Sequence, residues 1–294
     1  MNLWGLSILL IFILIFQLVG FFLSKIILAA AFNISTDQVA ELMSRPNGTA
    51  LSINIGRFSN LINFLCYMGV PSVLFLLINR ISINEIGHYN KKPLLLKIGW
   101  SVLLGISAIP VISVLTKWTS QLPFPESVEG IAKKLSNMRN VLFENMLDMN
   151  HISELLFCIV LIALIPAILE EFIFRGIILK IGLLQYKKAL TAFLFQGFVF
   201  AIIHLSLYEL PGIFLMGSIF GYLAFKNSHL WYNTITHFIF NGVTVFLYYY
   251  VSQEFKRSGI HYNVDEILAN FLFAIPASII MGLSIFNLTK QENE

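Results

Sequence analysis

Apolar runs close to the length needed to cross a bilayer recur eight times along this chain. The sequence holds 57% hydrophobic and only 12% charged residues, with a mean hydropathy of +0.79. A soluble domain cannot bury that much apolar surface, so the sequence predicts an all-α, polytopic membrane protein with about eight transmembrane helices. The expected spans are residues 3–32, 58–79, 94–116, 152–181, 189–208, 211–225, 230–251 and 267–288.

The longest polar stretch, residues 117–150, separates the third and fourth expected spans. Its apolar residues recur with helical spacing, at Ile131, Leu135, Met138, Leu142 and Met146. This predicts one amphipathic helix on the membrane interface, although a lid or a docking helix fits equally well. Because the chain shows no repeat, we treat it as one integrated membrane domain, with an N-terminal part (1–150) and a core (151–294).

Basic residues suggest an orientation for the expected spans. Lys and Arg are dense in the segments 80–97 and 180–188, whereas the link between the fifth and sixth spans has none. An even number of spans then puts both termini in the cytoplasm, and Lys133, Lys134 and Arg139 in the 117–150 segment count against this. No Lys/Arg cluster is interleaved with exposed aromatics, so nucleic acid is excluded as a partner. The expected partners are the lipid bilayer, a peptide or membrane-protein substrate and a membrane-protein partner.

Two carboxylates and a guanidinium interrupt the fourth expected span, at Glu170, Glu171 and Arg175. A charge in the middle of a membrane helix costs roughly 3 kcal/mol on insertion scales, so helix stability does not explain them. Glu171 and Arg175 are four residues apart and predict a buried ion pair, whereas Glu170 points about 100° away. Pro166 frees the carbonyl of Ile162 and is expected to bend the helix ahead of the acids. The alternative for Arg175 is snorkelling to the nearby interface.

Polar side chains also occur in two other expected spans. His204 lies in the fifth, and His237 and Asn241 share one face of the seventh. Buried polar groups in a membrane need partners, so we expect these three residues and Glu170 to converge on one cavity. Taken alone, His204 is equally well explained as an interhelical hydrogen-bond donor, and Asn241 is more often a residue that holds helices together. The remaining histidines are interpreted as surface residues: His88, His151, His229 and His261.

The depths of the two intramembrane histidines are difficult to reconcile. In a straight helix that starts at residue 189, His204 lies about 22 Å along the axis, whereas His237 lies about 10 Å into its own helix. Helix tilt, a break near Gly197 or a later start of the fifth span would bring the two imidazoles level.

Three spaced patterns follow one another on separate expected helices: Glu170-Glu171-x-x-x-Arg175, Phe200-x-x-x-His204 and His237-x-x-x-Asn241. Together they resemble the signature motifs of the CPBP family, also called Abi. That family includes type II CAAX-box prenyl endopeptidases and bacteriocin-processing and self-immunity proteins. The resemblance extends over roughly residues 150–250 and leaves the first three spans and the 117–150 segment without a motif.

The resemblance implies an eight-helix intramembrane endopeptidase, with 151–294 as the CPBP-like catalytic core and a polar cavity open to the cytosol. By motif position, the catalytic residues would be Glu170, His204, His237 and Asn241, supported by an ion pair between Glu171 and Arg175. Glu170 would activate water together with His204, while His237 and Asn241 would stabilise the oxyanion. Peptide hydrolysis without a nucleophilic Ser or Cys requires such a base and such donors.

Metal dependence is left open by the sequence. Glu170, His204 and His237 are candidate ligands for an open Zn²⁺ site. The family that the motifs resemble has been classed with metallopeptidases, so the resemblance also implies a metalloendopeptidase. Glu170 cannot easily be both the sole carboxylate ligand and the general base, so we favour direct activation of water. Cys66 and Cys158 lie in apolar stretches and predict neither a disulfide framework nor a Cys-based metal site.

Two other functions fit the same residues. A catalytically inactive relative would bind and regulate a membrane partner or enzyme, and a transporter would use the buried carboxylates as a proton or cation relay. The complete set of four polar residues favours the protease over a scaffold, and the lack of an inverted repeat disfavours the transporter. A prenylated CAAX protein, a bacteriocin leader and a quorum peptide are all compatible substrates.

Overall fold

The computed structural model describes residues 3–227, 229–258 and 264–290, and every regular element within them is a helix. In the first half these are α1 (Leu3–Phe32), α2 (Thr36–Ser44), α3 (Ala50–Phe64), η1 (Leu65–Gly69), α4 (Val70–Asn79), α5 (Ile83–Gly87), α6 (Leu95–Ser120) and α7 (Glu126–Leu147). In the second half they are α8 (Ile152–Cys158), η2 (Ile159–Leu164), α9 (Ile165–Glu171), η3 (Phe172–Ile178), α10 (Leu179–Gln185), α11 (Ala189–Ile203), α12 (Leu210–Asn227), α13 (Trp231–Ser258), α14 (Val264–Leu268) and α15 (Phe271–Thr289). The elements labelled η are π-helical turns inside longer helices. The all-α prediction is therefore confirmed for the described residues.

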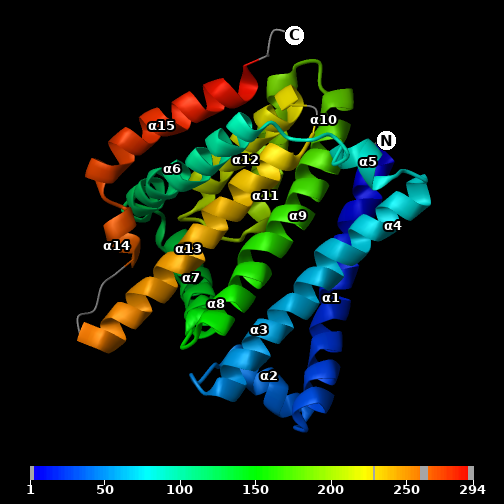
Figure 1. The fold of residues 1–294 in the computed structure, drawn as a ribbon. Helices are drawn as coiled ribbons and strands as arrows, with labels where there is room; N and C mark the ends of the chain where they lie inside the picture. The colour runs from blue at the N-terminus through cyan, green and yellow to red at the C-terminus, as the bar shows by residue number, and fades with distance from the viewer. Residues whose placement is uncertain (1–2, 228, 259–263, 291–294) are drawn as a thin grey trace.

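The long helices run back and forth between the two ends of a bundle (Figure 1). The start of α1 and the end of α15 lie at one end, termed the terminal end. The turn from α1 to α2, and α7 with the start of α8, lie at the other, termed the α7 end. The continuous helix from α8 to α10 passes through the middle of the bundle and carries the two acids.

Five helical runs among the described residues are long and apolar enough to cross a membrane. They are Gly5–Phe32, Ala50–Asn79, Leu95–Ser120, Ile152–Gln185 and Phe271–Thr289. The protein is therefore a multi-pass membrane protein, but the predicted number of eight spans is not confirmed. α11 is apolar but has only 15 residues, about 22 Å of helix against a hydrocarbon core of about 30 Å.

Several predicted boundaries are wrong because capping residues were overlooked. The second long helix begins at Ala50 rather than 58, since the side chain of Thr49 accepts the N–H of Ser52. The fifth ends at Ile203 rather than 208, because His204 caps α11 and Leu205 adopts a left-handed φ of 50°. The short helices α2, α5 and α14 were not predicted, since 9, 5 and 5 residues are too few to repeat a helical period over several turns. The start of α2 is nevertheless marked by a capping box between Ser35 and Gln38.

His229 is not the surface residue that we expected. It is only 8% exposed and packs against the ring of Tyr232 with centroids 4.6 Å apart, and burial lowers the pKa of its imidazole. His88 is half-buried, His151 is exposed, and His261 lies outside the described residues.

Two prolines inside long helices each follow a π-helical turn, whereas Pro110 and Pro276 lie within the α-helices α6 and α15. Pro71 occupies the second position of α4 after η1, and Pro166 the second position of α9 after η2. Proline has no N–H and its ring clashes with the carbonyl four residues earlier, so a wider turn just ahead accommodates it. The distortion predicted ahead of the acids is therefore a π turn.

Glycines bring α11 and α12 into backbone contact. A Cβ built on Gly217 would lie 2.9 Å from Cα of Gly197, and one built on Gly197 would lie 2.4 Å from Oγ of Ser218. Any side chain at either glycine would force the two helices apart. The small-xxx-small pattern Gly217-x-x-x-Gly221 of α12 thus serves close helix packing.

A buried arginine fixes one end of α7 to the bundle. Arg57 on α3 is 2% exposed, and it donates through Nε to the carbonyl of Met146 and through Nη2 to that of Asp148, each at 2.9 Å. Its Nη1 also lies 3.6 Å from Oε1 of Glu154 at the start of α8. The amphipathic helix predicted in 117–150 is therefore present, and its C-terminal end is held against the transmembrane helices.

Candidate active site

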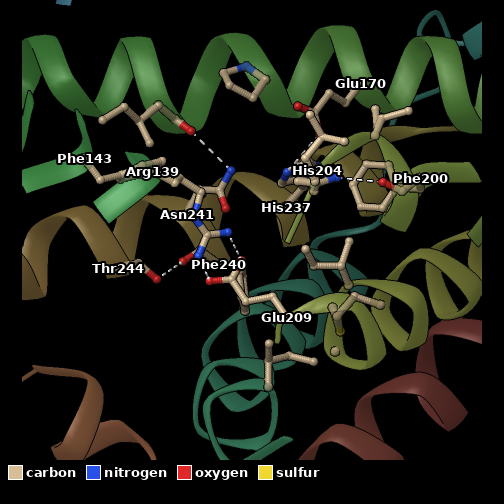
Figure 2. Close-up of a pocket in the computed structure, with 18 of the residues that line it drawn as sticks. Arg139, Phe143, Glu170, Phe200, His204, Glu209, His237, Phe240, Asn241 and Thr244 are labelled. Atoms are coloured by element: carbon tan, nitrogen blue, oxygen red, sulfur yellow. Dashed lines mark hydrogen bonds and ion pairs between the residues drawn. The ribbon is translucent and has the colours of Figure 1, made fainter. Parts of the chain in front are cut away.

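A cavity of about 1200 Å³ lies inside the bundle, lined by residues of α1, η1, α6, α7, α9, α11, α12 and α13 among others. Glu170, His204, His237 and Asn241 all line it, which brings together the four residues predicted to converge (Figure 2). Most of the remaining lining is apolar, so the polar groups lie in a low-dielectric surrounding where their electrostatic interactions are strong.

Glu171, the last residue of α9, connects Arg175 in η3 to His237 in α13. Its Oε1 accepts from Nη1 of Arg175 at 2.9 Å and from Nδ1 of His237 at 2.8 Å. The side chains of Glu171 and Arg175 are both 0% exposed. The ion pair expected from the four-residue spacing is therefore present, and it also orients a histidine more than 60 residues away in sequence.

Arg175 lies in a cage of aromatic rings beside this pair. Its guanidinium carbon is 4.4 Å from the ring centroid of Phe200 and 5.0 Å from that of Phe220. Nε and Nη2 have no hydrogen-bond partner among the described residues, so the ring faces compensate part of the cationic charge. Arg175 is 1% exposed, and the snorkelling interpretation is wrong.

The carboxylate of Glu170 is the least satisfied polar group of the site. Oε2 lies 3.8 Å from Nε2 of His237, which is beyond hydrogen-bond distance. Within the described part of the chain, Glu170 forms no hydrogen bond, although its residue is only 8% exposed. A separation of 3.8 Å between two acceptors is suited to a water molecule that donates to both.

The hydrogen bonds of the two histidines assign their tautomers. Nδ1 of His204 lies 2.6 Å from the carbonyl oxygen of Phe200, and Nδ1 of His237 faces the Glu171 carboxylate. Both partners accept only, so the proton is on Nδ1 in each ring and Nε2 carries a lone pair when the imidazole is neutral. Both neutral histidines therefore present an acceptor, the form that a general base requires.

Asn241 has a partner that was not foreseen. Its Nδ2 donates to the carbonyl of Ile162 at 3.2 Å, which is the carbonyl that Pro166 deprives of its helical donor. One N–H of the amide is thus engaged in repairing the helix that carries the acids, and the other remains for the cavity.

Phe200 brings the two histidines together despite their different positions along the helices. Its ring centroid is 4.7 Å from that of His204 and 6.4 Å from that of His237. α11 starts at Ala189 and continues through Gly197, so neither a later start nor a break occurs. Of the three expected adjustments, tilt between the helices remains.

The three residues considered as zinc ligands do not form a ligand cluster. Across residues 3–227, 229–258 and 264–290, no group of three or more His, Cys, Asp or Glu side chains is placed to hold a metal ion. Nδ1 of His237 is engaged with Glu171 and Nδ1 of His204 with a backbone carbonyl, which leaves only Nε2 of each ring for a ligand. The three candidate zinc ligands are therefore not assembled into a metal site among the described residues. Cys66 and Cys158 are both free thiols.

An ion pair that the sequence did not suggest lies at the α7 end of the cavity. Arg139 of α7 forms a bidentate contact with Glu209, which precedes α12, and both residues line the cavity (Figure 2). At the terminal end the cavity is lined by Ile178, which is 1% exposed.

Comparison with known proteins gives one family match. Residues 152–243 match the family model described as Rce1-like, type II CAAX prenyl endopeptidase Rce1-like. The matched segment is less than half of the chain but contains all three motifs, and it confirms the resemblance inferred from them. No curated protein and no solved structure shows significant similarity to the chain.

Proposed function

We propose, on the premise that this chain is a CPBP-type membrane protein, that it is an intramembrane endopeptidase. The observation that carries the proposal is the Glu170 carboxylate, which lines the cavity and forms no hydrogen bond among the described residues. Its Oε2 lies 3.8 Å from Nε2 of His237, and the buried Glu171–Arg175 pair orients that imidazole. Structural carboxylates in apolar surroundings are paired, because an unpaired one is costly. A carboxylate held without a hydrogen bond beside an oriented acceptor nitrogen is suited to bind and deprotonate water.

In the proposed reaction, water bound between Glu170 and Nε2 of His237 attacks the carbonyl carbon of the scissile peptide bond. Glu170 and His237 share the proton that water loses, and the charge of Glu171 stabilises the imidazolium that forms. The C–N bond then breaks, and the proton is transferred to the leaving amine. His204, across the Phe200 ring, is the second imidazole in reach of that amine.

This assignment changes one role implied by the family resemblance. By motif position, His204 was expected to help Glu170 activate the water, and His237 was expected to stabilise the oxyanion. The 3.8 Å approach to Glu170 favours His237 as the partner of the base. The proposed mechanism uses protein side chains alone and routes no step through a metal.

The experiment uses the full chain reconstituted in liposomes. The probes are quenched fluorescent peptides that end in a CAAX box, with and without a farnesyl group, and a bacteriocin-leader peptide. Glu170→Gln should lower kcat by about 10²- to 10⁴-fold, the range for loss of a general base. Glu209→Gln, a matched acid of the same cavity, should stay within a few fold. Failure of the wild type to cleave any probe, or equal rates for both acid variants, would overturn the proposal.

We also propose that both termini lie in the cytoplasm, from the density of Lys and Arg at the terminal end. A single cysteine at Lys188, with Cys66 and Cys158 replaced by Ser, should then react with impermeant maleimide only after the membrane is opened. Labelling in intact cells would contradict this proposal. It would mean that the termini lie outside the cell and that the α7 end of the cavity faces the cytosol.

A further inference from the structure

The motif residues supply acceptors to the cavity but few donors. Each neutral imidazole uses its N–H outside the cavity, on the Phe200 carbonyl and on the Glu171 carboxylate. Glu170 can only accept in its ionised form, and one N–H of Asn241 is spent on Ile162. Hydrolysis of a peptide bond develops negative charge on the carbonyl oxygen and requires donors aimed at it.

Tyr67 supplies a neutral donor on the same cavity. It belongs to the π turn η1 and lines the cavity together with its neighbour Met68. Glu170 lines the same cavity, and its helix α9 packs against η1. The tyrosine forms no hydrogen bond with any other residue in the described ranges. The phenol O–H is thus available to a substrate.

The ring of Tyr67 is well fixed. It meets Phe64 edge to face with centroids 5.3 Å apart and packs against the buried cluster that contains Phe64 and Phe174. Because the ring is fixed in advance, little reorganisation energy is needed to place its hydroxyl in the transition state. An effective oxyanion donor requires such preorganisation. The phenol donates while neutral, whereas an imidazole of this site donates into the cavity only after it is protonated.

We propose that Tyr67 is a further catalytic residue, whose hydroxyl donates to the scissile carbonyl oxygen as the tetrahedral oxyanion forms. This inference rests on the proposed endopeptidase function. It places a catalytic group in the N-terminal part of the chain, outside the segment 152–243 that matches the family model.

The test is Tyr67→Phe, which removes the hydroxyl and keeps the ring that packs on Phe64. Loss of one oxyanion donor should lower kcat by about 10²- to 10³-fold. KM should stay unchanged, because the interaction forms only in the transition state. Thermal unfolding in detergent should match the wild type. Tyr248→Phe, a second tyrosine that lines the cavity from α13, is the control and should keep kcat.

The outcomes separate this inference from the proposed function. Loss of activity in Glu170→Gln with full kcat in Tyr67→Phe would refute the donor role and leave the endopeptidase standing. A raised KM with unchanged kcat would also refute it, since the hydroxyl would then only bind the ground state. A wild type that cleaves none of the peptides would remove both.

Discussion

The buried pair of Glu171 and Arg175 allows stability and catalysis to be separated. Glu171→Gln keeps a carbonyl oxygen that can accept from Nδ1 of His237, but it removes the charge that balances Arg175. The guanidinium is then left at 0% exposure with only aromatic faces and the more distant Glu170 for compensation. The double variant Glu171→Gln/Arg175→Met removes both charges and places a thioether among the phenylalanine rings.

The expected magnitudes follow from this burial. Removing one partner of a buried ion pair costs roughly 3–5 kcal/mol, whereas replacing both by neutral groups is often neutral or stabilising. For a chain of 294 residues, that loss corresponds to a decrease in Tm of roughly 5 to 8 °C. The single variant should show this decrease, and the double variant should recover most of it. Catalysis should fall by about 10²- to 10⁴-fold in both, because neither retains the charge that stabilises the His237 imidazolium.

Thermal unfolding in detergent, followed by circular dichroism, and kcat in liposomes measure the two effects on the same preparations. Recovery of kcat together with Tm in the double variant would show that the pair is only a scaffold. An unchanged Tm in the single variant would contradict the cost assigned to the unpaired guanidinium.

Three further predictions concern the surroundings of the site. Arg57→Met should lower the free energy of unfolding by roughly 3 kcal/mol or more, because two charged hydrogen bonds of about 1.5–3 kcal/mol each are lost. The kcat should stay nearly unchanged. A variant as stable as the wild type would show that Arg57 does not hold α7 to the bundle. Asn241→Ala should lower the free energy of unfolding by about 1–3 kcal/mol, because it leaves the Ile162 carbonyl without a donor. Adding Pro166→Ala should reduce this loss, since the backbone N–H that alanine restores at this position can donate to the same carbonyl. Strictly additive losses would show that Asn241 and Pro166 are not coupled. The pKa of Glu85 is lowered, chiefly by a hydrogen bond from the backbone N–H ahead of α5, so its stabilisation of α5 is present above its ordinary pKa and is lost as the pH falls. Hydrogen exchange at that amide, corrected for its intrinsic pH dependence, should therefore accelerate in acid, and Glu85→Gln should remove the effect.

The sequence predicted the parts of the site that depend on helical spacing. Glu171 and Arg175 lie four residues apart on one turn, and the two polar residues of α13 share a face for the same reason. Convergence of four polar residues on one cavity followed from the cost of burying them unpaired. These inferences need no knowledge of how the helices are arranged.

Other features depend on tertiary packing that the sequence does not specify. Tyr67 stands in an apolar run where tyrosine is an ordinary membrane residue, so no pattern marked it. Arg139 and Glu209 are separated by 70 positions, and nothing local pairs them. The link from Glu171 to His237 likewise joins two helices whose contact could not be derived from either one. The missed start of α3 was readable, since Thr49 is a common N-cap residue.

The most direct measurement of the central claim is an experimental structure at a resolution that reveals ordered water. We predict a water molecule within hydrogen-bond reach of both Oε2 of Glu170 and Nε2 of His237, in a cavity that Tyr67 also lines. Apolar side chains packed between the carboxylate and the imidazole, with no room for water, would contradict the account. Glu170 would then be a buried acid without a catalytic role.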